Sequence, residues 1–118
     1  DSKSCTFVIG QILSNAIKYR KDNLQVEFSA RAEKNTVSLF ISDNGIGISA
    51  ADLPRVFDKG FTGENGRRYS KSTGTGLYLS QRLCRKMNIS LSISSVPGQG
   101  TTVTMVFPTE SYLQAAGL

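Results

Sequence analysis

The sequence contains no histidine, and this absence removes several kinds of chemistry from the chain itself. Without an imidazole there is no histidine base, no histidine nucleophile and no zinc site built on imidazole ligands. The two cysteines, Cys5 and Cys84, lack a CxxC spacing, so we interpret them as reduced thiols that pack as small apolar groups. No uncharged apolar run reaches the roughly 18 residues that a membrane helix needs, and the first residues lack a signal-peptide pattern, so we expect a soluble segment.

The composition is typical of one globular domain. With 118 residues, 39% of them hydrophobic and 19% charged, the chain fits a single modest core, and we expect one domain over residues 1–118. The net charge of +5 favours anionic partners, but it does not separate nucleotides from nucleic acid or lipid headgroups.

Hydrophobic periodicity predicts three helices and two hairpins. Apolar residues recur every three or four positions in both longer helices, alternate in the strands, and a capping-box pattern begins the short middle helix. The expected helices span residues 5–19, 49–57 and 77–87, and the expected strands span 25–32, 36–42, 89–93 and 103–107. Hairpin connections between the strands indicate an α+β fold, a two-layer sandwich with the helices on one face of a mixed, largely antiparallel sheet.

Three polar patterns could form a site. Gln11, Asn15 and Lys18 share one face of the first helix, where an amide oxygen and an ammonium group suit a magnesium-bound phosphate; the alternative is a solvated helix face. Asp43 ends a strand before Gly45 and Gly47, so a carboxylate could accept a hydrogen bond from an exocyclic amine while the glycines make room for a flat base; the alternative is a tight turn.

The third pattern is Gly74-Thr75-Gly76-Leu77, which opens a helix and offers backbone N–H groups and the positive end of the helix dipole to a phosphate. The glycine-rich stretch 58–75 before it carries several cations, Arg67 and Lys71 among them, and is interpreted as a flexible lid or, equally, as a solvated loop. Neither a Walker A loop nor a Rossmann fingerprint fits these glycines.

In chain order, Asn15-Ala16-x-Lys18-Tyr19, Asp43-x-Gly45-x-Gly47, Phe57 with Phe61, and Gly74-x-Gly76-Leu77 resemble the N, G1, F and G2 boxes of the ATP-binding domain of bacterial sensor histidine kinases. The stretch 60–67 further resembles membrane-bound kinases of Gram-positive bacteria that respond to antimicrobial peptides. The resemblance implies the Bergerat-type α/β sandwich shared by DNA gyrase, a heat-shock chaperone, histidine kinases and the MutL repair protein.

The resemblance also implies roles for individual residues. Asn15 would coordinate Mg²⁺ with help from Gln11, Lys18 would contact the phosphates of ATP, and Tyr19 would line the nucleotide. Asp43 would bind the adenine amine and Gly45 and Gly47 would make room for the base. The remaining nucleotide-binding positions are Gly74, Thr75, Gly76 and Leu77, with Arg67 or Lys71 of the lid reaching the γ-phosphate.

The resemblance implies that the phosphoacceptor histidine lies on an upstream dimerisation domain, so we expect this chain to be a fragment that binds ATP and Mg²⁺ and donates the γ-phosphoryl group to that histidine. Onward transfer would go to a response-regulator aspartate. The parent would be a membrane-bound homodimer with this part in the cytoplasm, and the fragment a monomer that binds no nucleic acid. A non-enzymatic nucleotide-sensing module and the ATPase part of a DNA-processing relative are the alternatives.

Overall fold

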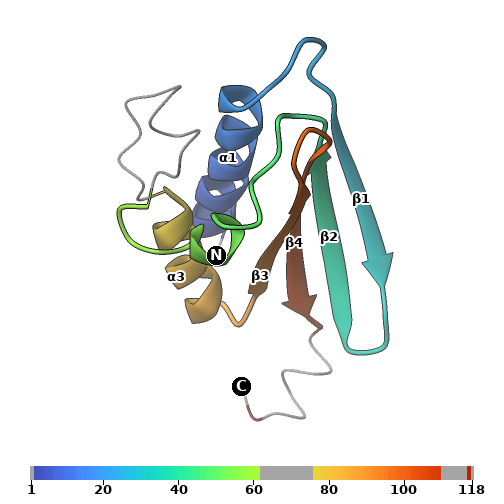
Figure 1. The fold of residues 1–118 in the computed structure, drawn as a ribbon. Helices are drawn as coiled ribbons and strands as arrows, with labels where there is room; N and C mark the ends of the chain where they lie inside the picture. Colours follow the sequence, from blue (N-terminus) through green and yellow to red (C-terminus); the bar gives the residue numbers. More distant parts are fainter. Residues whose placement is uncertain (1, 62–75, 110–116, 118) are drawn as a thin grey trace.

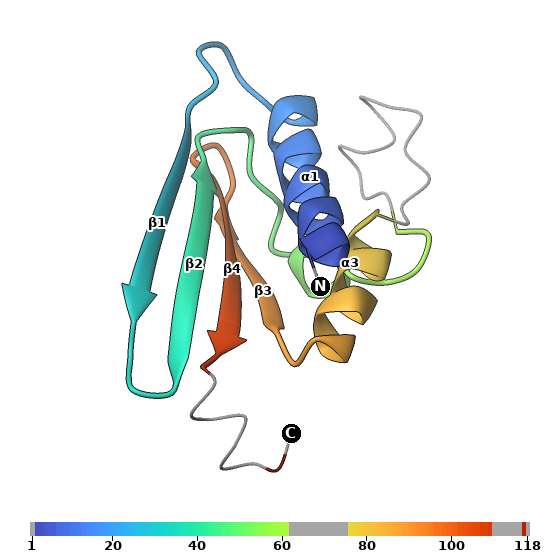
Figure 2. The ribbon, with the colours of Figure 1, turned by 180° about the vertical axis from the view of Figure 1, so that it is seen from behind.

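The computed structural model describes residues 2–61, 76–109 and 117, which form a helical layer packed on a sheet (Figure 1). The elements in chain order are α1 (Ser2–Lys18), β1 (Val26–Ala32), β2 (Thr36–Asp43), the 3-10 helix η1 (Leu53–Arg55), α3 (Gly76–Lys86), β3 (Ser90–Val96) and β4 (Gly100–Pro108). Helices α1 and α3 lie side by side on the same face of the sheet in both views (Figures 1 and 2). The predicted two-layer α+β sandwich is therefore confirmed.

The sheet has the order β1-β2-β4-β3, and each of these three described pairings is antiparallel. Both predicted hairpins are present. In the first, the backbone N–H of Glu33 donates to the Thr36 carbonyl at 2.8 Å, which closes the turn at the expected place. The predicted middle helix is shorter than expected, because only Leu53–Arg55 is helical.

The strand registers align side chains into rows across the sheet. Ser95, Thr101 and Asp43 are paired in succession on β3, β4 and β2 and form a polar row at one end of the sheet. Two residues further along each strand, Ile93, Val103 and Ile41 form an apolar row. Residues two apart in a strand share a face, so both rows point towards the helices and a polar edge borders an apolar floor.

The core lies between this face of the sheet and the two helices. Its buried members are Val8, Ile12, Ile41, Cys84, Ile89, Leu91, Val103 and Met105. Both cysteines are free thiols: Cys84 is buried, and the half-buried Cys5 Sγ lies 4.0 Å from Met87 Sδ, so they pack as small apolar groups as predicted. Burial raises the pKa of the Cys84 thiol.

Helical spacing assigned two apolar residues to the wrong environment. The three- and four-residue spacing puts Ile17 in the buried stripe of the first helix and Leu79 on the apolar side of the last one, but they are 51% and 43% exposed. On α3 the buried positions are instead Ser80 and Cys84, one turn apart. Ser80 can be buried because its hydroxyl donates to the Gly76 carbonyl at 2.7 Å within the same helix, which satisfies the polar group.

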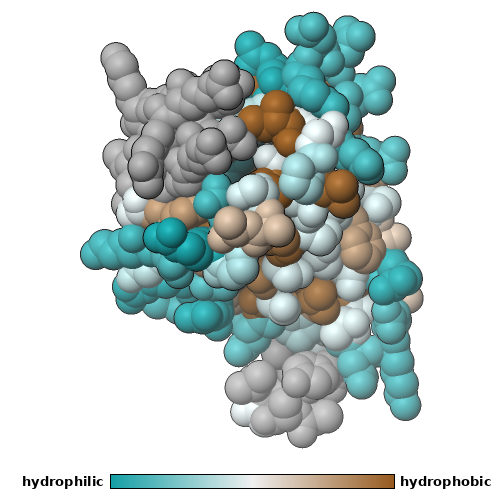
Figure 3. Space-filling view, viewed as in Figure 1, coloured by the Kyte–Doolittle hydropathy of each residue, from teal (hydrophilic) through white to brown (hydrophobic). Residues whose placement is uncertain are grey.

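Strand β1 is the outer edge of the sheet and lies beyond the reach of the helices (Figure 1). Alternation predicted a strand with one covered face, yet Phe28 is 51% exposed although it is paired with the buried Ile41. Among the coloured residues of the face shown in Figure 3, hydrophilic ones lie mainly along the margins, and several hydrophobic ones lie near the middle. In the described part of the chain, no helix is long and apolar enough to cross a bilayer.

The position of Met105 yields a test of the core. Its side chain is fully buried at the centre of β4, so Met105→Ala removes packing and leaves a cavity. We expect the free energy of unfolding to fall by about 2–5 kcal/mol. Leu79→Ala, at an exposed position on α3, should change it far less. Urea unfolding of both variants measures the difference, and equal losses would contradict this description of the core.

Candidate functional site

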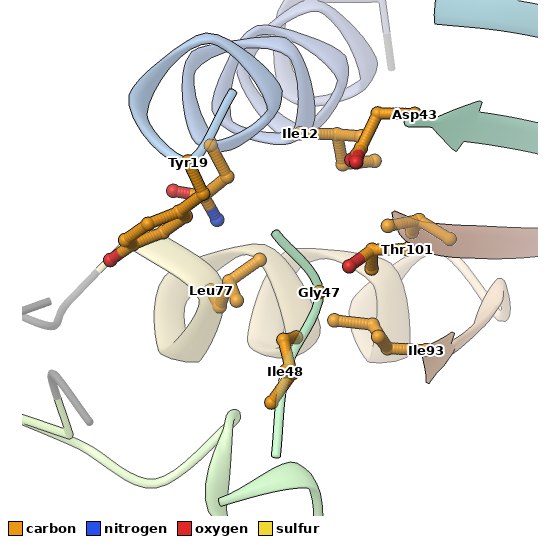
Figure 4. A pocket seen from close by; sticks show the side chains of 10 residues that line it. Ile12, Tyr19, Asp43, Gly47, Ile48, Leu77, Ile93 and Thr101 are labelled. Carbon is orange, nitrogen blue, oxygen red and sulfur yellow. The ribbon is translucent and has the colours of Figure 1, made fainter. Parts of the chain in front are cut away.

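A cleft lies between the helices and the polar end of the sheet (Figure 4). Its empty space is about 460 Å³, part of it open to solvent. The described residues that line it are Ile12, Asn15, Tyr19, Asp43, Gly47, Ile48, Leu77, Ile93, Thr101 and Val103.

Asp43 supplies the carboxylate of the cleft and is held by its own turn. Its Oδ1 accepts a hydrogen bond from the Gly45 backbone N–H at 2.8 Å, which fixes the side-chain direction. The next side chain, Asn44, is tied to the segment before β1, because it accepts from the Gln25 N–H at 2.8 Å and donates to the Asn23 carbonyl at 3.0 Å. No hydrogen bond joins Asp43 Oδ2 to another described residue, so it is free to accept one from a ligand.

Gly45 and Gly47 are needed because the backbone packs closely around them. A Cβ on Gly45 would lie 2.6 Å from the Tyr19 carbonyl oxygen and 3.0 Å from Asp43 Oδ1. Gly47 has φ +76°, and a Cβ there would lie 2.5 Å from the Val96 carbonyl oxygen. The sequence interpretation explained these glycines by the space a base requires; the structure adds that the chain's own backbone already fills the space next to them.

The polar face of α1 divides into different environments. Asn15 lines the cleft directly, whereas a Cβ on Gly76 would collide with Gln11 Oε1, so the Gln11 amide lies against the beginning of α3. Lys18 is not among the described lining residues, and its Nζ lies 5.7 Å from the centre of the Tyr19 ring. Burial lowers the pKa of the Lys18 ammonium and raises the pKa of the Tyr19 hydroxyl.

The N-terminus of α3 points its first turn at the cleft, where Leu77 is a lining residue. Unpaired N–H groups and the helix dipole make such an end attractive to anions. Leu77 therefore borders the cleft, whereas Gly76, the first residue of α3, is not among its lining residues. Gly74, Thr75, Arg67 and Lys71 lie outside the described residues, as does most of the proposed lid.

Sequence reasoning missed half of the lining residues. Ile12, Ile93 and Val103 follow the apolar periodicity and were interpreted only as core, and Ile48 belonged to a turn without an assigned role. Thr101 carried no signal of its own. Only the register, which pairs Thr101 with Asp43 on the neighbouring strand, shows that it belongs to the site.

Together these groups suit a flat, amine-bearing ring with an anionic tail. Ile93 and Val103 of the apolar row offer a floor, the Asp43 carboxylate offers an acceptor for an amine, and Asn15 and Leu77 border the same cleft. Among the described residues there is no group of three or more His, Cys, Asp or Glu side chains that could hold a metal. The Asn15 amide oxygen lines the cleft, and an amide oxygen together with oxygens of a phosphate and water is a donor set that Mg²⁺ accepts.

Comparisons with known proteins identify the family to which the chain is similar. Residues 1–111 match the family model described as histidine kinase-, DNA gyrase B- and HSP90-like ATPase. The chain is 42% identical over 111 residues to the sensor protein kinase GraS of Staphylococcus aureus strain JH1, and the same identity holds for GraS of strain Newman. The match covers 94% of this chain but only 32% of the GraS sequence, so the chain spans about a third of this relative.

Solved structures share the fold. The mycobacterial sensor histidine kinase MprB superposes with a TM-score of 0.81 at 23% identity, over 92% of this chain and 74% of MprB. The catalytic domain of histidine kinase ThkA gives a TM-score of 0.75 at 17% identity, over 92% and 69% of the two chains. At these identities the likeness concerns the architecture alone.

The surroundings of Gly47 yield a test of the loop that borders the cleft. Gly47 and Gly98 have similar positive φ angles of +76° and +81°, but only Gly98 has open space where a Cβ would be. We expect Gly98→Ala to lower the free energy of unfolding by about 1–2 kcal/mol, from backbone strain alone. Gly47→Ala should cost clearly more because the blocking atoms belong to the backbone. Thermal unfolding measures both variants. Equal decreases in the free energy of unfolding would contradict the idea that the Val96 carbonyl excludes a Cβ at position 47.

Proposed function

The chain belongs to the family of histidine kinase-, DNA gyrase B- and HSP90-like ATPases, and on this premise we propose that it is the ATP-binding catalytic domain of a two-component sensor histidine kinase. The observation that carries the proposal is the single cleft in which Asp43, Asn15 and Leu77 meet over an apolar floor. The apolar floor and the Asp43 carboxylate suit a purine base, and the part of the cleft at Asn15 and Leu77 suits a triphosphate. The Gram-positive relatives support the same branch of the family for this chain.

The nucleotide would lie with its base against Ile93 and Val103 and its exocyclic amine at Asp43. Its phosphates would extend towards Asn15 and the first turn of α3. Lys18, on the same helix as Asn15 but not among the lining residues, would attract them together with the net charge of +5. Mg²⁺ would neutralise phosphate charge when bound. Asn15 would hold it by its amide oxygen, and Gln11, whose Oε1 lies against Gly76, would assist from the same helix.

The chain would hold the donor and another domain would supply the acceptor. Phosphoryl transfer depends mainly on positioning and charge stabilisation, so a cleft that orients the nucleotide contributes without a nucleophile of its own. No histidine is present in the sequence. We therefore infer that the γ-phosphoryl group goes to a histidine on a separate helical dimerisation domain, then to a response-regulator aspartate, in a membrane-bound homodimer whose catalytic domain is cytoplasmic.

Asp43→Asn tests the nucleotide part of the proposal. Asparagine keeps one acceptor oxygen for the Gly45 N–H, but it replaces the other carboxylate oxygen with an NH2 group, which donates, and it removes the negative charge. We expect ADP affinity, measured by calorimetry with Mg²⁺, to fall about 10–100-fold, since a hydrogen bond to a charged group contributes about 1.5–3 kcal/mol.

Asp22→Asn provides the matched control, because Asp22 is an exposed carboxylate in the loop after α1. It should leave both the ADP affinity and the unfolding midpoint unchanged. Saturable ADP binding that survives Asp43→Asn at full strength would argue against adenine recognition by this carboxylate.

Phosphorylation of a histidine-bearing domain tests the kinase part. Incubated with Mg²⁺, γ-labelled ATP and the helical dimerisation domain of its own parent protein, the chain should transfer label to an acid-labile phosphohistidine. The chain alone should remain unlabelled. EDTA and Asn15→Ala should each abolish the transfer. Tight ATP binding with no transfer would instead support a nucleotide-sensing module.

A further inference from the structure

Ser95 lies in the polar row of the sheet but is not among the described residues that line the cleft. It is half-buried on β3, next to Thr101 on β4, which does line the cleft. Its hydroxyl makes three contacts, with the Ile48 backbone N–H at 2.8 Å, the Gly100 carbonyl at 2.7 Å and Thr101 Oγ1 at 3.0 Å. Ser95 therefore joins the loop that borders the cleft to the second hairpin.

The chemistry of these partners fixes the direction of each hydrogen bond. A backbone N–H can only donate, so Ser95 Oγ accepts from Ile48. A carbonyl oxygen can only accept, so the single hydroxyl proton of Ser95 goes to Gly100. With that proton committed, the contact between Ser95 and Thr101 forms only if the Thr101 hydroxyl donates its own proton to Ser95 Oγ.

Thr101 is left with lone pairs and no proton for a ligand in the cleft. Its direct neighbour in the sheet is Asp43, whose Oδ1 already accepts from Gly45 and whose Oδ2 also accepts only. Side chains paired across antiparallel strands have Cβ atoms roughly 4.5–5.5 Å apart, so one amine, or a water bound to it, can reach both. Both residues border the same cleft (Figure 4).

We propose that Ser95 is a positioning residue for nucleotide selectivity: by taking the Thr101 proton, it makes the polar row of the cleft an acceptor-only edge that selects purines bearing a 6-amino group. The inference rests on the proposed binding of an adenine nucleotide and deepens it. Asp43 alone would supply one acceptor; Ser95 turns the adjacent hydroxyl, which could otherwise donate or accept, into a second.

The test compares two nucleotides that differ only in the 6-amino group. ADP and purine riboside 5′-diphosphate are titrated into the chain. The Kd of purine riboside 5′-diphosphate divided by the Kd of ADP reports how strongly the site recognises the amine. We expect Ser95→Ala to lower this ratio about three- to tenfold. Without Ser95 Oγ as acceptor, the Thr101 hydroxyl is able to donate its proton into the cleft and no longer acts only as an acceptor there. Thr101→Val, which removes the same acceptor and keeps a good strand former, should lower it similarly.

Controls separate this role from a purely structural one. Ser94→Ala, on the exposed face of the same strand, should leave the ratio unchanged, and Ser95→Thr should preserve it. Adding Ser95→Ala to Thr101→Val should produce no further fall. If Ser95→Ala weakens both nucleotides equally, the inference is overturned while the proposed function stands. If the unsubstituted chain binds no ADP, the proposed function fails and the inference with it.

Discussion

The cleft depends on how the loop of residues 45–48 is held on both sides by hydrogen bonds to its backbone. The Ile46 N–H donates to the Tyr19 carbonyl at the end of α1 at 3.0 Å, and its carbonyl accepts from the Gly98 N–H in the second hairpin at 2.7 Å. Ile48 N–H is bound by Ser95. One short segment thereby ties the end of α1 to the second hairpin. Buried backbone groups must be paired, so the loop cannot move without breaking these hydrogen bonds. The bonds therefore hold the walls of the cleft in fixed positions relative to one another.

This constraint explains why glycine is used where the loop is most crowded. Tyr19 and Val96 present carbonyl oxygens to the positions that Cβ atoms would occupy on Gly45 and Gly47. Gly100 is blocked in the same way by the Asp43 carbonyl. The Asp43 carboxylate, which would face the nucleotide under the proposed function, is thus bordered by closely packed backbone. Its direction is set by the fold before any nucleotide binds, which lowers the entropy lost on binding.

Sequence reasoning located the elements and the polar groups that are close in the chain to a motif. Asp43 with its glycines, and Asn15 on a helix face, are local patterns, and the structure brings both to one cleft. Ile17, Leu79 and Phe28 show the limit of periodicity: it gives the apolar face of an element but not whether a neighbour covers it. Coverage depends on the sheet order, which places β1 outside the helices.

Thr101 and Ser95 show a second limit. Serine and threonine are common in these strands, and nothing in their spacing separates the two that matter from those on the solvent side. Their significance arises from strand register, which sets Ser95, Thr101 and Asp43 side by side although they are distant in the chain. Whether the Thr101 hydroxyl donates or accepts in the cleft depends on Ser95, which is not among the lining residues.

The same geometry separates recognition from chemistry under the proposed function. The polar row of the sheet would contact the base, whereas Asn15 and the start of α3 would face the phosphates. Contacts to the base do not change as the γ-phosphoryl group moves, so they stabilise the ground state and the transition state equally and govern affinity. Contacts at the phosphate end lie where charge is redistributed, and they can favour the transition state. Selectivity at the polar row could therefore change without altering the step of phosphoryl transfer.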